Sequence, residues 1–190
     1  MSDRLTSKWT ENAAQAFGAT GVKGDAGEKM MLQWLLKHPI NNVSPLQPIH
    51  HGADRIMQKQ GIDITWRCPS SGSLVSCDVK ANLTDDGIFY VYHDEWLYKS
   101  KADKITHVNT KTGEIVSYNT EQMKAFCKTL EEALQRKEWD TLRSKYVYFS
   151  MSWVDWDNIR GRQKRVPAWF KFSRTQRPDF VQTLQEAEDA

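Results

Sequence analysis

The chain has 190 residues, of which 39% are hydrophobic and 26% charged, a balance that suits one folded domain and excludes wholesale disorder. Its net charge of +2 is too small to indicate nucleic acid by itself, and its three cysteines, without a CxxC pair, indicate neither a disulfide framework nor a zinc ribbon. No stretch reaches the ~20 apolar residues of a transmembrane helix, and residues 1–9 lack the order of a secretion signal, so a cytoplasmic protein is expected.

The first half of the chain is expected to place two helices before a β-hairpin. Apolar residues at helical spacing predict one helix over residues 3–17 and a second over about 25–37, with Asp25 as a candidate N-cap. A Pro-rich irregular segment follows. Residues 61–80 then form two strand-like runs around a five-residue turn of Pro, Ser and Gly, which predicts the hairpin.

The second half is expected to add strands around one strong helix. Strands are predicted over 88–92, 104–108, 114–118 and 146–151, an amphipathic helix over 120–136, and a short helix or a frayed end over 178–190. This order indicates a single domain of the α/β or α+β class, with its core over about 20–151.

The hairpin carries the first candidate functional groups. Strand side chains alternate with period two, so Asp78 and Lys80 share one face while Cys77 and Val79 face the other way; on the first strand, Asp63 faces opposite to its isoleucine neighbours. Two carboxylates and one ammonium on paired strands could hold a divalent metal and activate a water beside a phosphate. The alternative is a solvated strand face that carries an ordinary ion pair.

Glu28 is the third candidate acid. On the predicted second helix it shares a face with Met31, Leu32 and Leu35. A carboxylate on a core-facing stripe needs a partner or a metal. A surface carboxylate stabilised by the helix dipole is an equally good interpretation of the sequence.

The order Glu28, Asp63, Asp78-x-Lys80 resembles the PD-(D/E)XK nuclease superfamily, in which a helix supplies a Glu and the following hairpin an Asp and then an (Asp/Glu)-x-Lys. The resemblance covers about residues 23–108; it includes Lys23-Gly24 before the helix and closes on a segment with Ser100, Asp103 and His107. The proline that names the motif is absent, and Gly61-Ile62 precedes Asp63. The resemblance implies an α/β, restriction-endonuclease-like core: a central mixed sheet of four to five strands flanked by helices.

The resemblance also implies a role for each residue. Glu28, Asp63 and Asp78, with the carbonyl of Val79, would ligate Mg²⁺ or Mn²⁺, since hard cations prefer carboxylate oxygens. Lys80 would orient the attacking water, make that water more acidic or neutralise charge growing on the phosphate. Gln60 and Asn82 flank the ligand positions and are expected to support them, and Gln58 and Lys59 lie close in sequence.

A basic segment over residues 158–178 contains no acid and seven basic residues. Basic side chains neutralise phosphates, and the interleaved Trp169, Phe170 and Phe172 could stack on unpaired bases. The candidate nucleic-acid-binding residues are Arg160, Arg162, Lys164, Arg165, Lys171 and Arg174. A basic solvated loop with its aromatics packed inward is the alternative, and Lys99, Lys101 and Lys104 form a second basic cluster that a solvated face would explain equally well.

The sequence therefore predicts a single-domain, Mg²⁺-dependent DNA nuclease, expected to be an endonuclease acting on double-stranded or branched DNA, alone or as a homodimer. The alternatives are a non-catalytic nucleic-acid-binding protein of the same fold and a repair, recombination or RNA nuclease. The histidines, among them His50, His51 and His107, lack zinc-site spacing and are expected to be structural. No P-loop and no nucleophile elbow is present, so neither ATP use nor a serine hydrolase is indicated.

Overall fold

The computed structural model describes residues 24–37, 48–51, 54–68, 71–92, 97–136, 138, 148–157 and 162–184. For residues 148–157 and 162–169 only the backbone is described. The helix expected over residues 3–17 and the candidate Arg160 lie outside these ranges. Among the described helices, none is both long and apolar enough to cross a lipid bilayer.

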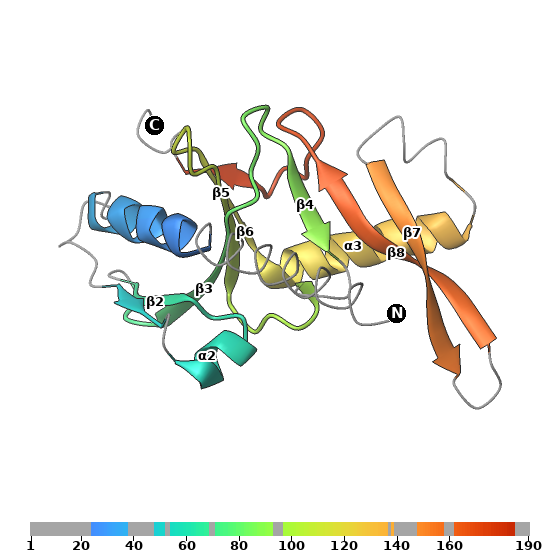
Figure 1. Cartoon of the computed structure of the whole chain (residues 1–190), viewed down its shortest axis with the longest axis horizontal. Coiled ribbons are helices and arrows are strands. Elements are labelled where there is room, and N and C mark those ends of the chain that lie inside the picture. The colour runs from blue at the N-terminus through green and yellow to red at the C-terminus, as the bar shows by residue number, and fades with distance from the viewer. Residues whose placement is uncertain are drawn as a thin grey trace, which may run out of the picture.

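A mixed sheet of six strands forms the centre of the molecule (Figure 1), in the order β1-β2-β3-β5-β6-β9. Its strands are β1 (Ile49–His50), β2 (Ile64–Arg67), β3 (Leu74–Lys80), β5 (Lys104–Val108), β6 (Ile115–Asn119) and β9 (Gln182–Thr183). Strands β3 and β5 run parallel and every other neighbouring pair runs antiparallel.

The strand count corrects the expected four to five. The four inner strands were predicted, and the two-residue strands β1 and β9 add one at each edge. Strand β9 also replaces the short helix or frayed end expected there. Two residues are too few to show an alternation of polar and apolar side chains, so sequence patterns cannot detect such strands.

The predicted hairpin is confirmed as β2 and β3, with Ile64 opposite Cys77 and Arg67 opposite Leu74. Next to it, Asp103 fixes the start of β5 against β3, because its Oδ2 accepts hydrogen bonds from the backbone N–H and the hydroxyl of Ser76, both at 2.7 Å. The parallel β3–β5 pair is thereby anchored at one end.

A second sheet of three strands, in the order β4-β8-β7, packs beside the first. Its strands are β4 (Phe89–Tyr92), β8 (Arg162–Phe172) and β7 (Tyr148–Asp157), and the ribbon of β7 and β8 projects away from the six-stranded sheet (Figure 1). Strand β7 runs six residues beyond the predicted end at 151. Most of the basic segment is strand β8 rather than a loop, but Phe170 and Phe172 are buried in the core, so these two aromatics pack inward as the alternative predicted.

Helices cover both faces of the central sheet, which confirms the α/β class. Helix α3 (Thr120–Gln135) begins at its N-cap Asn119 and buries Met123, Cys127 and Leu130 in a core shared with β5, β6, β4 and β8. A helix over residues 24–37 packs Met31 and Leu35 in a second core against β2 and β3. Residue 24 is already helical, so Asp25 lies inside this helix and is not its N-cap. The short helix α2 (Arg55–Lys59) connects β1 to β2.

All three cysteines are free thiols, as predicted. Cys77 and Cys127 are buried, and burial raises the pKa of the Cys77 thiol to about 12. A thiol with so high a pKa is a poor nucleophile and metal ligand at neutral pH.

Candidate active site

Asp78 and Lys80 lie on the same face of β3, as the strand period predicts. The Asp78 side chain is 1% exposed and forms an ion pair, through Oδ1, with Lys80 Nζ; the Lys80 side chain is 26% exposed. Within the described residues, neither Asp78 oxygen accepts a hydrogen bond of normal geometry. A buried carboxylate balanced by one ammonium is not a solvated strand face, so this alternative is wrong for Asp78.

The environment of Asp78 makes it unusually basic for a carboxylate. Burial raises the pKa of Asp78 to about 6, against the lowering effect of the Lys80 ammonium, and the negative charge of Asp63 adds to the rise. Asp78 therefore titrates close to neutral pH.

Asp63 is fixed against the backbone of β3. Its Oδ2 accepts a hydrogen bond from the Val79 N–H at 2.7 Å, and its own N–H donates to the Cys77 carbonyl at 2.9 Å. Its Oδ1 accepts from Gln58 Nε2 at 3.2 Å. The carboxylate is 6% exposed and is held between the two residues that flank Asp78 in sequence.

Glu28 is buried and has a side-chain partner, so it is a core-facing acid and not a surface carboxylate. It is 9% exposed and shares a hydrogen bond with Nε2 of His50 on strand β1. Its helix approaches the end of β3 closely, since a Cβ at Gly27 would lie 3.0 Å from the Cβ of Ala81. Burial raises the pKa of Glu28, against the hydrogen bond from His50, and the charge of Asp63 raises it further.

The register explains why Glu28 and Asp78 do not meet. His50 pairs with Ile64 and Ile64 with Cys77, so these residues share the face that the 24–37 helix covers. Asp78 follows Cys77 in the strand and therefore projects from the opposite face. Among the described residues, no three His, Cys, Asp or Glu side chains form a group that could hold a metal ion. The three predicted acids are thus not preassembled as one ligand set.

The donors that are present nevertheless suit Mg²⁺. Magnesium in proteins is commonly held by one or two carboxylates, several waters and substrate phosphates rather than by a closed protein cage. Asp63 and Asp78 supply two buried carboxylates; that of Asp78 also pairs with Lys80 and lies beside the Ser100 hydroxyl. The roles of Glu28 and of the Val79 carbonyl as ligands stay predictions.

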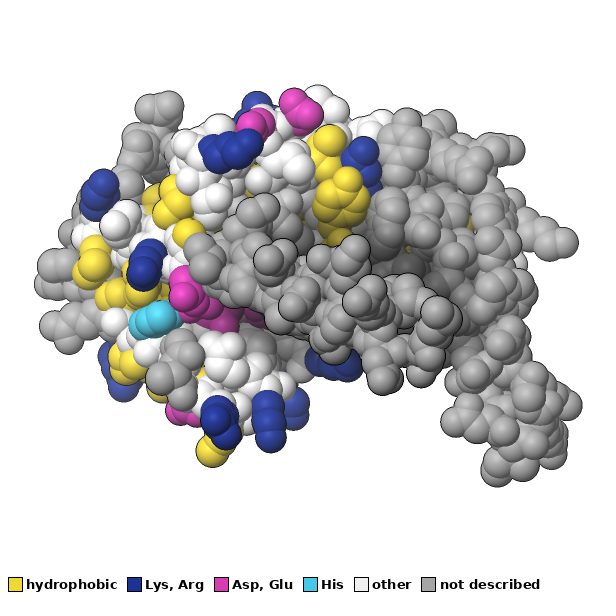
Figure 2. Space-filling view, viewed as in Figure 1, with side chains coloured by type: hydrophobic (Ala, Val, Ile, Leu, Met, Phe, Trp, Pro, Cys, Tyr) yellow, Lys and Arg dark blue, Asp and Glu magenta, His cyan; other side chains and the backbone are white. Residues whose placement is uncertain are grey.

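A small cavity of about 160 Å³ opens over Asp78. It is lined by Lys59, Gly61, Asp78, Lys80, Lys99 and Ser100. The segments that carry these residues are tied together: the Lys101 N–H donates to the Gln60 carbonyl at 2.8 Å, and Ser100 Oγ donates to the Gly61 carbonyl at 3.4 Å. Figure 2 shows acidic side chains gathered between the 24–37 helix and α2, with a histidine beside them and basic side chains around.

Gln60 and Asn82, which were expected to support the metal ligands, make other contacts. Gln58, rather than Gln60, donates to Asp63, and Gln60 takes part through its backbone. Asn82 Oδ1 accepts a hydrogen bond from His107 Nδ1, and Asn82 Nδ2 donates to the Tyr90 carbonyl at 3.4 Å, so Asn82 supports the buried His107 and not the carboxylates. Adjacency in sequence misidentified these two because Gln60 caps helix α2 and Asn82 follows the end of β3, so neither lies on the strand face that carries the acids.

Sequence reasoning also missed His50 as the partner of Glu28, since it judged histidines by zinc-site spacing alone. The two residues lie 22 positions apart and meet only because β1 pairs with β2. The signal in sequence was weak: a histidine beside a predicted irregular segment. His107, by contrast, is fully buried and structural as expected, with Nε2 at 2.8 Å from the Tyr118 hydroxyl.

The candidate nucleic-acid-binding residues inside the described ranges belong to β8 and the turn after it, not to the hairpin or the 24–37 helix that carry Asp63, Asp78 and Glu28. Arg162, Lys164 and Arg165 are positions of β8 whose side chains are outside the described set, and half-buried Lys171 lies near the end of that strand. Arg174 donates from Nε to Glu114 at 3.0 Å and also from Nη2, so its guanidinium is bound to a buried acid of the same chain.

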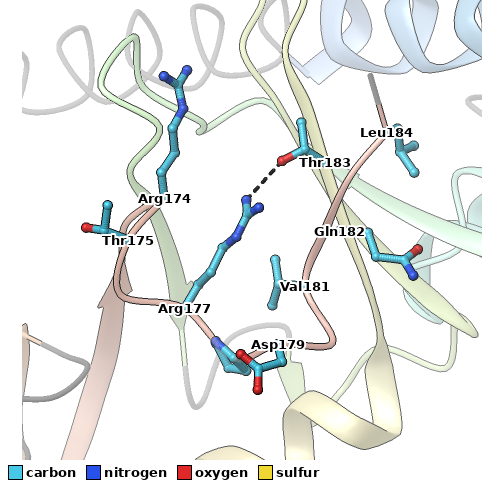
Figure 3. A pocket seen from close by; sticks show the side chains of 9 residues that line it. Arg174, Thr175, Arg177, Asp179, Val181, Gln182, Thr183 and Leu184 are labelled. Atoms are coloured by element: carbon cyan, nitrogen blue, oxygen red, sulfur yellow. Dashed lines mark hydrogen bonds between the residues drawn. The ribbon is translucent and has the colours of Figure 1, made fainter. Parts of the chain in front are cut away.

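A larger cavity, of about 590 Å³, lies at this other end of the molecule (Figure 3). Arg177 points into it from the turn after β8 and donates from Nη1 to Thr183 Oγ1 at 3.0 Å, which links that turn to β9. The guanidinium groups that line this cavity, those of Arg174 and Arg177, both bind protein acceptors. The described residues of the lining contain no pair of a carboxylate and a lysine like Asp78 and Lys80. The smaller cavity is therefore the better candidate for chemistry.

Comparison of the chain with family models, with curated proteins and with solved structures finds no match.

Proposed function

We propose that the protein is a metal-dependent nuclease that hydrolyses DNA phosphodiester bonds, with a restriction-endonuclease-like arrangement of its core and endonucleolytic action on double-stranded or branched DNA. The observation that carries the proposal is the buried carboxylate of Asp78, paired with Lys80 and lining a cavity beside the fixed carboxylate of Asp63. An acid and an amine that share such a cavity suit hydrolysis of a phosphate ester.

Each residue has a definite task under this proposal. Asp63 and Asp78 would hold the metal, with the Val79 carbonyl and Glu28 as further predicted ligands. When bound, Mg²⁺ or Mn²⁺ would polarise the phosphate and make a bound water more acidic. Lys80 lies beside Asp78, where its ammonium can orient the attacking water and neutralise charge that develops on the phosphate oxygens.

The test is hydrolysis of plasmid DNA and of 5′-labelled linear and branched DNA, with Mg²⁺ and with EDTA. The wild-type protein should cleave only with the metal. Lys80→Ala and Asp78→Asn should each lower the rate by a factor on the order of 10² or more, the usual contribution of a positioned acid–base or charge-stabilising group.

Lys101→Ala is the matched control, because Lys101 is exposed, close in sequence to the cavity residues and not part of its lining. It should keep most of the activity. Full activity in the Lys80 and Asp78 variants, or equal cleavage with EDTA, would reject the site assignment.

A non-catalytic nucleic-acid-binding protein of the same fold is the second candidate. It is favoured by the absence of a three-ligand group among the described residues and by the basic positions along the projecting ribbon of β7 and β8. A two-stranded ribbon can enter the major groove of DNA. On this alternative, binding would depend on salt but not on metal, and Arg162→Ala with Arg165→Ala would weaken it more than Asp78→Asn.

A further inference from the structure

The lining of the small cavity carries a net positive charge, although a buried acid lies at its floor. Three ammonium groups, those of Lys59, Lys80 and Lys99, line it together with the single carboxylate of Asp78. With all four groups ionised the lining carries a net charge of +2, that is, three positive charges less one negative. Such a lining favours a bound anion over a free cation.

The three lysines differ in position. Lys80 is part of β3 and pairs with Asp78 in the floor of the cavity, whereas Lys59 and Lys99 are exposed residues on its rim. Lys59 ends helix α2, and Lys99 precedes the buried Ser100. Exposed ammonium groups above a buried acid can reach the outer oxygens of a ligand that the floor groups act upon.

The backbone holds the two rim segments in place. The Gln60 N–H donates to the Met57 carbonyl at 2.9 Å, and the Lys101 N–H donates to the Gln60 carbonyl at 2.8 Å. Lys124 Nζ donates to the Ser100 carbonyl at 3.1 Å, which ties the second segment to helix α3. The Cα positions of Lys59 and Lys99 are therefore set relative to β3, while their side chains are exposed to solvent.

The size of the cavity limits what can enter. At about 160 Å³ the cavity is smaller than the ~300–1,000 Å³ pockets that bury a drug-sized ligand. A compact phosphate group suits a space of this size better than a whole nucleoside does. A site that holds only the phosphate makes no contact that distinguishes one base from another.

We propose that Lys59 and Lys99 form a phosphate clamp: they bind the non-bridging oxygens of one backbone phosphate of a polynucleotide and position it over Asp78 and Lys80, independently of the base sequence. This inference rests on the proposed function, because it takes the cavity as the place where the reacting phosphate lies. It assigns a binding role to two lysines outside the Glu28, Asp63, Asp78 and Lys80 set.

The test measures binding without turnover. Fluorescence anisotropy with a labelled single-stranded 12-mer, in EDTA and over a series of salt concentrations, gives the slope of log K against log [salt]. Because the clamp neutralises one phosphate, the Lys59→Ala/Lys99→Ala double variant should make this slope less steep by about 0.7, the value per neutralised phosphate of a single strand. Two oligonucleotides of different sequence should show the same change.

The control is a double variant of two other exposed lysines, Lys111→Ala/Lys128→Ala, which removes the same charge outside the cavity and outside the cluster of Lys99, Lys101 and Lys104. Its slope should stay close to that of the wild type. An unchanged slope in the Lys59/Lys99 variant, or an equal change in both double variants, would overturn the clamp. Thermal unfolding of all variants verifies that they fold, which is expected because all four lysines are exposed.

A second measurement localises the contact. An oligonucleotide with one neutral methylphosphonate should bind the wild-type protein more weakly when the neutral group occupies the clamp, and the Lys59→Ala/Lys99→Ala variant should lose this discrimination. Retained discrimination in the variant would overturn the assignment. The experiments distinguish failure of the clamp from failure of the nuclease proposal. If the wild-type protein shows no Mg²⁺-dependent cleavage, the nuclease proposal is wrong. If the wild-type protein cleaves DNA but the Lys59→Ala/Lys99→Ala variant keeps the wild-type binding slope, only the clamp is wrong.

Discussion

Gly61 lies directly against the buried carboxylate of Asp78: a Cβ at this position would be 2.9 Å from Asp78 Oδ2 and 3.1 Å from Ser100 Oγ. The residue also has φ of +66°, a conformation that L side chains rarely adopt. Glycine is required here on both grounds, and its missing side chain leaves the cavity over Asp78 open.

Gly61→Ala should therefore lower both stability and activity. Gly72 is the matched control, because it has φ of +69° but no heavy atom within 4 Å of its Cβ position. Gly72→Ala should cost about 1 kcal/mol from backbone strain alone, and Gly61→Ala about 1–3 kcal/mol more, from the displaced carboxylate. Chemical denaturation of both variants checks this; equal losses would show that the contact with Asp78 is unimportant.

The hydrogen bond between Glu28 and His50 should appear as a coupling between the two residues. Each single change, Glu28→Gln and His50→Ala, removes the partner of the other side chain, so the double variant should be less destabilised than the sum of the two. We expect a coupling of about 1 kcal/mol, modest because the His50 side chain is 40% exposed. Replacement of His51, which contacts Thr65 instead, serves as the control and should show no coupling with Glu28.

Asp78 should make the protein less stable as the pH rises from 4 to 6. Its pKa is raised from 3.8 to about 6 on folding, so the protonated acid favours the folded state below pH 3.8, and this contribution is lost as the pH rises through 6. The loss is on the order of 3 kcal/mol at ~1.4 kcal/mol per pKa unit. Asp78→Asn should lack this slope in metal-free urea unfolding curves; parallel curves for the two proteins would contradict the burial of an ionisable acid.

His107, in contrast to Asp78, should make the protein less stable as the pH falls. Burial lowers its pKa from 6.5 to about 3, with the Lys80 charge as a second cause, so the folded state holds it neutral between Asn82 and Tyr118. Its contribution to stability is present above pH 6.5 and is lost as the pH falls toward 3, because the unfolded chain takes up the proton first. His107→Gln should flatten the acid side of the stability curve, and an NMR titration that finds the ring protonated at pH 6 in the folded protein would contradict this account.

Much of the central fold was predictable because its elements carry strong local patterns. Strands β2, β3, β5 and β6 and helix α3 each show a run of apolar residues at the right period, and all five were predicted near their observed bounds. The partition into two sheets was not predictable. Phe89–Tyr92 was recognised as a strand, but its pairing with β8, some eighty residues later, depends on packing between distant segments.

The candidate site likewise combines features that the sequence predicts with features that it does not. That Asp78 and Lys80 share a face followed from the sequence alone, because the alternation of side chains is a local property of any strand. The burial of Asp78, the pairing of Glu28 with His50 rather than with the other acids, and the arrival of Lys99 and Ser100 over the cavity were decided only by the tertiary structure. These features depend on which remote segments pack together, and the sum of many weak contacts across the whole chain, rather than any short motif, determines that choice.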